Sequence, residues 1–136
     1  MGGGKCYILI TLLLILISLK QQKIEASKSY NVTIVDGLGD GENLVFRCQS
    51  KDTDFGVHYL NETGQSFSWV FKVNIIRTTL YFCHFYWKDK DVSFPVFEAH
   101  NQGDACGYLV YWQVRDDGFY FHCDADALVY KRSWYK

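Results

Sequence analysis

The chain is poor in proline, in unbalanced charge and in long apolar runs. It has one proline among 136 residues, and its formal net charge is −1. With 49% hydrophobic and 21% charged residues, its composition excludes disorder, collagen-like repeats and low-complexity linkers. A polyanion-binding protein should be strongly basic, so this charge balance argues against DNA or RNA as a partner.

Aromatic residues are abundant instead. Ten tyrosines, ten phenylalanines and four tryptophans make up 18% of the chain. Ring side chains suit pleated, half-buried surfaces, so this composition favours an all-β domain over a helical bundle. The length fits one small domain, since domains typically have about 100–150 residues.

One apolar run lies near the amino end. It follows Lys5 and extends from Tyr7 to Leu19. Its 13 residues are fewer than the roughly 18–20 needed to cross a bilayer, but they match the core of a signal peptide. Small residues are favoured before the cleavage site, which predicts cleavage after Ala26. We therefore expect a signal peptide over residues 1–26, one domain over 27–136, and a secreted, extracellular protein whose mature chain does not insert into a membrane. An uncleaved membrane anchor is the alternative.

Turn residues divide the mature chain into short runs with the alternation of strands. In Ser66–Val73, for example, the apolar residues alternate with Ser66, Ser68 and Lys72. Seven to nine short strands, spaced about 8–12 residues apart, predict a small antiparallel β-sandwich without helices. The expected strands are Tyr30–Asp36, Asn43–Cys48, Val57–Leu60, Ser66–Val73, Thr79–Trp87, Asp91–Ala99, Gly107–Val114, Phe119–Cys123 and Ala127–Lys131.

Three segments carry more specific expectations. Thr79–Trp87 is apolar or aromatic on both faces, as expected for a central strand that is covered on each side. Pro95 cannot donate a ladder hydrogen bond, so its strand should lie at a sheet edge or contain a bulge. Arg115–Gly118 predicts a hairpin, because glycine readily adopts a positive φ.

Four cysteines remain once Cys6 leaves with the leader: Cys48, Cys83, Cys106 and Cys123. An even number in a small secreted domain indicates two disulfides, with three possible pairings. Buried free thiols are the alternative. Cys48 and Cys123 both occupy inward positions of their strands, which favours Cys48–Cys123 and leaves Cys83–Cys106. The choice depends on the strand order, which is not visible in the sequence.

Two glycosylation sequons fit the secretory pathway. They are Asn31-Val32-Thr33 and Asn61-Glu62-Thr63. Asn61 falls in an expected turn, where an oligosaccharide projects freely, whereas Asn31 lies near the start of a strand.

The residue pattern of an enzyme or a metal site is not found in the sequence. The histidines are not spaced as metal ligands, and no nucleophile elbow or phosphate loop is present. Carboxylate pairs such as Asp124 and Asp126 supply too few ligands for calcium. We therefore expect no catalytic residue, no metal, no cofactor and no enzymatic activity.

Three blocks of residues occur in an order and spacing that a known family shares. The first block is Phe46–His58 (FRCQSKDTDFGVH), the second comprises Trp69–Phe71, Thr79–Cys83 and Trp87, and the third is Tyr111–Tyr120 (YWQVRDDGFY). The first is similar to a Cys-x-Ser-Lys-Asp-x-Asp-Leu-Gly-x-His stretch. Together the blocks span essentially the whole mature chain and resemble the plant self-incompatibility S-protein homologues.

One position departs from the family's pattern. The family often has a cysteine just before the tryptophan of the third block, where this chain has Tyr111. If Val114 pairs with Phe119, Tyr111 lies opposite His122, and Cys123 is one step further along the partner strand. The disulfide pairing of the family is therefore not carried over to this chain.

The resemblance implies a small secreted β-sandwich ligand, of a kind that a pollen receptor perceives in self-incompatibility. The expected partner is an unidentified cell-surface receptor protein, and the mature protein is expected to be a monomer. Polar loops are the expected recognition sites, because loops on a rigid scaffold vary without disturbing the core. The alternative is a secreted carbohydrate or cell-wall binding module with exposed rings, although most rings occupy inward strand positions. The expected recognition residues are Asp52, Thr53, Asp54, Glu62, Lys88, Asp89, Lys90, Asn101, Gln102 and Asp104.

Overall fold

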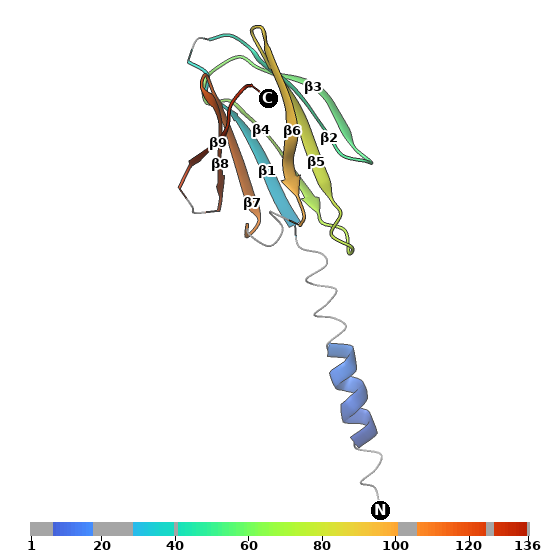
Figure 1. The fold of residues 1–136 in the computed structure, drawn as a ribbon. Coiled ribbons are helices and arrows are strands. Elements are labelled where there is room, and N and C mark those ends of the chain that lie inside the picture. Colours follow the sequence, from blue (N-terminus) through green and yellow to red (C-terminus); the bar gives the residue numbers. More distant parts are fainter. Residues whose placement is uncertain (1–6, 18–28, 40, 101–105, 125–126, 136) are drawn as a thin grey trace, which may run out of the picture.

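The computed structural model describes residues 7–17, 29–39, 41–100, 106–124 and 127–135. The strands are β1 (Ser29–Asp36), β2 (Leu44–Gln49), β3 (Asp54–Leu60), β4 (Ser66–Lys72), β5 (Leu80–Trp87), β6 (Lys90–Glu98), β7 (Leu109–Arg115), β8 (Gly118–Cys123) and β9 (Val129–Arg132). They form a five-stranded sheet of order β4-β1-β7-β8-β9 and a four-stranded sheet of order β3-β2-β5-β6. The two sheets pack face to face (Figure 1).

This architecture confirms the expected all-β sandwich, with two differences. Strand β1 pairs with β7 in parallel, so the five-stranded sheet is not purely antiparallel. Residues 7–17 form a helix, although the sequence analysis expects none. That segment is rich in leucine and contains no glycine or proline, which favours a helix. Among the described residues, no helix combines the length and the apolar character needed to span a bilayer.

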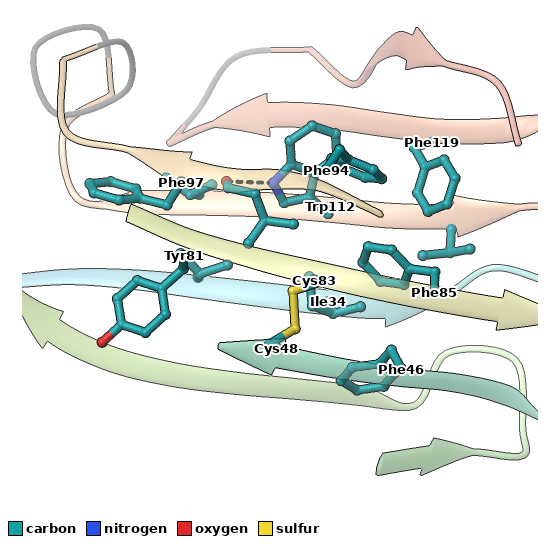
Figure 2. Packing of buried hydrophobic residues seen from close by; sticks show 14 of the residues in the cluster. Ile34, Phe46, Cys48, Tyr81, Cys83, Phe85, Phe94, Phe97, Trp112 and Phe119 are labelled. Atoms are coloured by element: carbon teal, nitrogen blue, oxygen red, sulfur yellow. Dashed lines mark hydrogen bonds between the residues drawn. A yellow bond between two sulfur atoms is a disulfide. The ribbon is translucent and has the colours of Figure 1, made fainter. Parts of the chain in front are cut away.

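Alternation along the strands builds the core between the sheets (Figure 2). Ile34, Phe46, Phe85 and Phe119 are fully buried there. The ring centroids of Phe85 and Phe119, which come from different sheets, are 5.0 Å apart. Burial of one such side chain contributes roughly 1.5–3 kcal/mol, so interdigitated rings hold the two sheets together.

Two local expectations are confirmed. Pro95 lies in β6, at the edge of the four-stranded sheet, and the pairing of β6 with β5 shifts register next to it. The expected hairpin joins β7 to β8, and Gly118 has a φ of 147°. Val114 pairs with Phe119 as anticipated.

The four cysteines form two disulfides, but the pairing favoured by the sequence analysis is wrong. The bonds are Cys48–Cys83 and Cys106–Cys123, rather than Cys48–Cys123 and Cys83–Cys106. Cys48 and Cys123 are both buried, as their inward positions require, but they belong to different sheets. Cys83 lies directly opposite Cys48 in the β2–β5 register. An inward orientation therefore does not identify the neighbouring cysteine; the strand order does.

Strand β5 is central, as expected, but the core covers only one of its sides. Tyr81, Cys83 and Phe85 point into the sandwich and are buried. Leu80 and Tyr86 are exposed on the other side. The expectation that this strand is covered on each side is therefore wrong, because the sandwich has two layers and the outer side of β5 faces away from the core.

Candidate functional site

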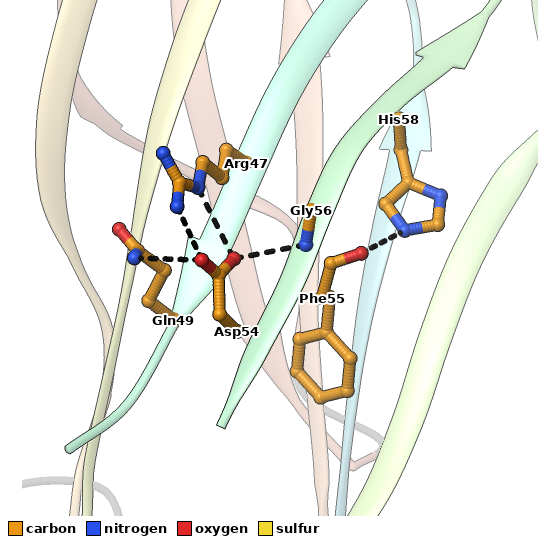
Figure 3. Close-up of polar contacts among 6 residues, drawn as sticks. All are labelled: Arg47, Gln49, Asp54, Phe55, Gly56 and His58. Carbon is orange, nitrogen blue, oxygen red and sulfur yellow. Dashed lines mark hydrogen bonds and ion pairs between the residues drawn. The ribbon is translucent and has the colours of Figure 1, made fainter. Parts of the chain in front are cut away.

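An ion pair joins β2 and β3 on the outer face of the four-stranded sheet (Figure 3). Arg47 Nε donates to Asp54 Oδ1 at 3.1 Å, and Arg47 Nη2 pairs with Asp54 Oδ2. Gln49 Nε2 donates to the same carboxylate at 3.2 Å, and the backbone N–H of Gly56 donates at 2.9 Å. Three residues therefore hold one exposed carboxylate.

These contacts favour the charged forms of both partners. The hydrogen bond from Arg47, followed by the backbone N–H of Gly56, lowers the pKa of Asp54 to about 2. The same hydrogen bond and the charge of Asp54 raise the pKa of Arg47. The pair stays ionised at neutral pH, so it acts as a fixed polar feature of the surface and not as a proton-transfer group.

Other residues of the same hairpin shape its turn and the strand that follows. Ser50 Oγ accepts a hydrogen bond from the Thr53 N–H at 3.1 Å, and the Ser50 N–H donates to the Thr53 carbonyl at 2.7 Å. Gly56 has a φ of 74°. His58 Nε2 donates to the Phe55 carbonyl at 2.9 Å. Ser50, Asp54, Gly56 and His58, which belong to the block that carries the family resemblance, thus have structural roles in this hairpin.

The expected recognition residues lie at two opposite ends of the sandwich. Val45 pairs with both Tyr59 and Tyr86, close to the end that carries Glu62 and Lys88–Lys90. The turn of β5 and β6 projects from this end (Figure 1).

The other end carries the β2–β3 turn. Gln49 pairs with Asp54 and Phe82 there, and Asp52 is exposed. Thr53 is partly buried and is hydrogen-bonded to Ser50. Asp54 belongs to a strand and not to a loop. The remaining expected residues, Asn101, Gln102 and Asp104, lie outside the described residues.

The turn between β5 and β6 rests on aromatic rings. The Nζ atoms of Lys88 and Lys90 each lie 4.8 Å from the centroid of the Trp87 ring, within the range of cation–π attraction. The ring of Trp134 lies 5.6 Å from that of Trp87. A cavity of about 260 Å³ beside the turn is lined by Asp89, Lys90, Asp91, Trp134 and Tyr135.

The contribution of Trp134 and Tyr135 to this site is not visible in the sequence. They follow the last strand and show no alternation that would assign them to a surface. Trp134 Nε1 donates to the Arg115 carbonyl at 2.9 Å, which fixes the carboxyl-terminal segment beside the β7–β8 hairpin.

The two sequons differ in their surroundings. Asn61 is exposed in the turn that follows β3. Asn31 lies within β1 and is half-buried, between β4 on one side and β7 on the other. Thr33 Oγ1 lies 3.5 Å from Asn31 Oδ1, so the two sequon side chains contact each other.

His84 and His122 make contacts with different residues. His84 Nε2 donates to Asp91 Oδ1 at 2.9 Å, and the ring centroid of His122 lies 4.4 Å from that of Tyr111. Within the described ranges, no three His, Cys, Asp or Glu side chains are grouped in a way that would hold a metal ion.

Comparison with known proteins identifies the family. Residues 31–134 match the family model described as plant self-incompatibility protein S1. S-protein homolog 3 of Arabidopsis thaliana is 35% identical over 101 residues, which cover 71% of this chain and 67% of that protein. S-protein homolog 4 of Arabidopsis thaliana is 32% identical over 123 residues, which cover 86% of this chain and 80% of that protein.

A solved structure shares the fold. It is that of SPH (self-incompatibility protein homologue) proteins, described as a widespread family of small, highly stable, secreted proteins from plants. The TM-score is 0.64 at 24% identity, and the match covers 79% of this chain and 96% of that chain. These matches confirm the resemblance carried by the three sequence blocks: the chain belongs to the plant self-incompatibility protein S1 family and is an S-protein homologue.

Proposed function

We propose that this protein is a secreted signalling ligand that a cell-surface receptor protein recognises through the exposed surface of the sandwich. The signal peptide of residues 1–26 is removed, and the mature protein acts as a monomer that neither inserts into a membrane nor catalyses a reaction. Membership of the plant self-incompatibility protein S1 family supports this role.

The observation that carries the proposal is that the charged β5–β6 turn packs on buried aromatic rings. Lys88 and Lys90 project from the β5–β6 turn over the ring of Trp87, which also contacts the ring of Trp134 from the segment after β9. Side chains held on such a base lose less conformational freedom when a partner binds, which favours affinity.

Binding to cells tests the proposal. Labelled mature protein is titrated onto plant protoplasts, before and after the protoplasts are treated with a protease. We expect saturable binding that the protease abolishes. Lys88→Glu and Glu62→Lys should each weaken it tenfold or more, whereas Lys72→Glu on β4 should leave it within about twofold. Absence of saturable, protease-sensitive binding by the wild-type protein would contradict the proposal.

Secretion has its own test. N-terminal sequencing of the protein recovered from the medium should give a start near Ser27. Retention of Met1 in the recovered protein would contradict the assignment of the leader.

A further inference from the structure

Strand β5 carries apolar and aromatic side chains on the side that faces away from the core. A sheet with one solvated face normally alternates between apolar inward residues and polar outward residues. The outward residues of β5 are instead Leu80, Phe82, His84 and Tyr86, although this strand lies in the middle of its sheet. Leu80 and Tyr86 are exposed to solvent. In the described part of the chain, no further layer covers these apolar side chains.

The same character extends over the neighbouring strands. Val45 pairs with Tyr59 on β3 and with Tyr86 on β5, so two tyrosines flank it in one row. Val57 lies in the adjacent row, opposite Arg47. The exposed fractions of Tyr59, Val57 and Tyr86 are 65%, 54% and 42%. Opposite side chains on one face are about 5 Å apart, so Val45, Tyr59, Tyr86 and Val57 lie side by side. Phe82 and Leu80 continue the face beyond the row of Arg47 and His84. We call this set the outer-face stripe: Val45, Val57, Tyr59, Leu80, Phe82 and Tyr86.

Charged groups cross the middle of the stripe and bind their neighbours, because Arg47 and His84 pair in register between the row of Tyr86 and the row of Phe82. Arg47 is bound to Asp54 on one side, and His84 donates to Asp91 at 2.9 Å on the other. The rings of His84 and Tyr86 stack with their centroids 4.1 Å apart and their planes 12° apart. These contacts hold Tyr86 in place and engage Arg47, Asp54 and Asp91 in bonds within the face.

We propose that the outer-face stripe is the docking surface for the receptor protein, and that the receptor contributes an apolar patch to the part of the contact that covers the stripe. This inference rests on the function proposed above and specifies the surface that is used. A charged patch would lose its hydration without meeting an unpaired opposite charge. A glycan would require polar groups placed to receive its hydroxyls, and those beside the stripe already bond to each other.

The composition and position of the stripe also fit a protein partner. Tyrosine and arginine are enriched at the centres of protein interfaces, and polar residues form the rim. The stripe crosses the sheet between the two ends of the sandwich, with Glu62 and Lys88–Lys90 at one end and Asp52 at the other. A partner that covers the stripe therefore reaches both sets of turns, whereas a partner confined to one end does not.

Matched substitutions on the two sheets test the inference. Tyr86→Ser and Val57→Ser remove exposed groups from the stripe. Tyr130→Ser on β9 and Val70→Ser on β4 remove the same groups, at exposed fractions of 48% and 66%, from the other sheet. Binding of each variant to plant protoplasts is titrated, and its folding is checked by thermal unfolding. We expect tenfold or greater weakening for the two stripe variants and less than twofold change for their controls.

Each outcome decides a separate point. If the wild-type protein shows saturable binding and the stripe variants bind equally well, the stripe is not the docking surface, although the proposed function stands. If the wild-type protein shows no saturable binding, the proposed function itself fails. Binding of the wild-type protein to isolated cell-wall glycans, or its dimerisation in analytical ultracentrifugation, with loss of either in Tyr86→Ser, would assign the stripe to a glycan or to a second copy and overturn the inference.

Discussion

Cys48 and Cys83 lie directly opposite each other on β2 and β5, with their Cα atoms 4.0 Å apart and both side chains fully buried. The disulfide that joins them links two neighbouring strands of one sheet. Cys106–Cys123 likewise connects the segment before β7 to the end of β8, in the other sheet. Neither bond crosses between the layers, so the two sheets are joined by packing of the core and by the hydrogen bond from Trp112 Nε1 to the Val96 carbonyl.

Removal of the disulfides should destabilise the domain in a defined order. The two bonds span sequence separations of 35 and 17 residues. The chain-entropy model gives losses of about 4 kcal/mol for Cys48→Ala/Cys83→Ala and about 3 kcal/mol for Cys106→Ala/Cys123→Ala. Guanidinium unfolding measures both free energies, and replacing both cysteines of a pair avoids a free thiol. Recovery of a linked Cys48–Cys123 peptide from a non-reducing digest would refute the pairing.

The ion pair of Arg47 and Asp54 should make stability depend on acidic pH. The pKa of Asp54 is about 2 in the folded protein, below its ordinary value of 3.8. A carboxyl group with a depressed pKa stabilises the folded state above its unfolded pKa, and this contribution disappears as the pH falls through the folded pKa. The wild-type protein should therefore be more stable than Asp54→Asn at pH 7, and the difference should vanish between about pH 4 and pH 2. Urea unfolding over this range measures it; a difference that persists unchanged at pH 2 would exclude the ionised pair as its source.

Gly118 should not tolerate a side chain. A Cβ atom there would lie 2.3 Å from the Arg132 carbonyl oxygen, and the φ of 147° already disfavours other residues. Gly118→Ala should cost about 3 kcal/mol. Gly41→Ala is the matched control, because Gly41 also has a positive φ but no atom within 4 Å of the added group. Chemical denaturation of both variants separates the steric clash from backbone strain, and equal losses would contradict the clash.

Glycosylation should favour Asn61 over Asn31. Asn61 is exposed in a turn, whereas Asn31 is half-buried within a strand that has a partner on each side. The transferase needs an accessible, extended acceptor, which the turn provides more readily. Asn61→Gln should remove most of the mass that an N-glycosidase releases from the secreted protein, and Asn31→Gln should remove little. The reverse pattern would show that Asn31 is modified before β1 is incorporated into its sheet.

The sequence by itself determined the order and approximate positions of the nine strands, because the alternation of apolar and polar residues and the intervening turn residues act over short distances. Strand β3 is the exception at its start, since it begins at Asp54 and not at Val57. Pro95 indicated an edge or a bulge, and Arg115–Gly118 indicated a hairpin, for the same local reason. The three ordered blocks also indicate the family, which the family model confirms.

The tertiary structure alone decided how the strands are arranged. Periodicity shows which face a side chain takes, but it does not show which strand lies beside it, since that depends on packing between residues far apart in the sequence. For this reason the pairing of Cys48 with Cys83, the parallel contact of β1 with β7, and the joining of Trp134 to the β5–β6 turn were not readable in advance. The exposed outer side of β5 has the same origin. The sequence shows that both sides of this strand are apolar, but only the number of layers in the fold decides whether both are covered.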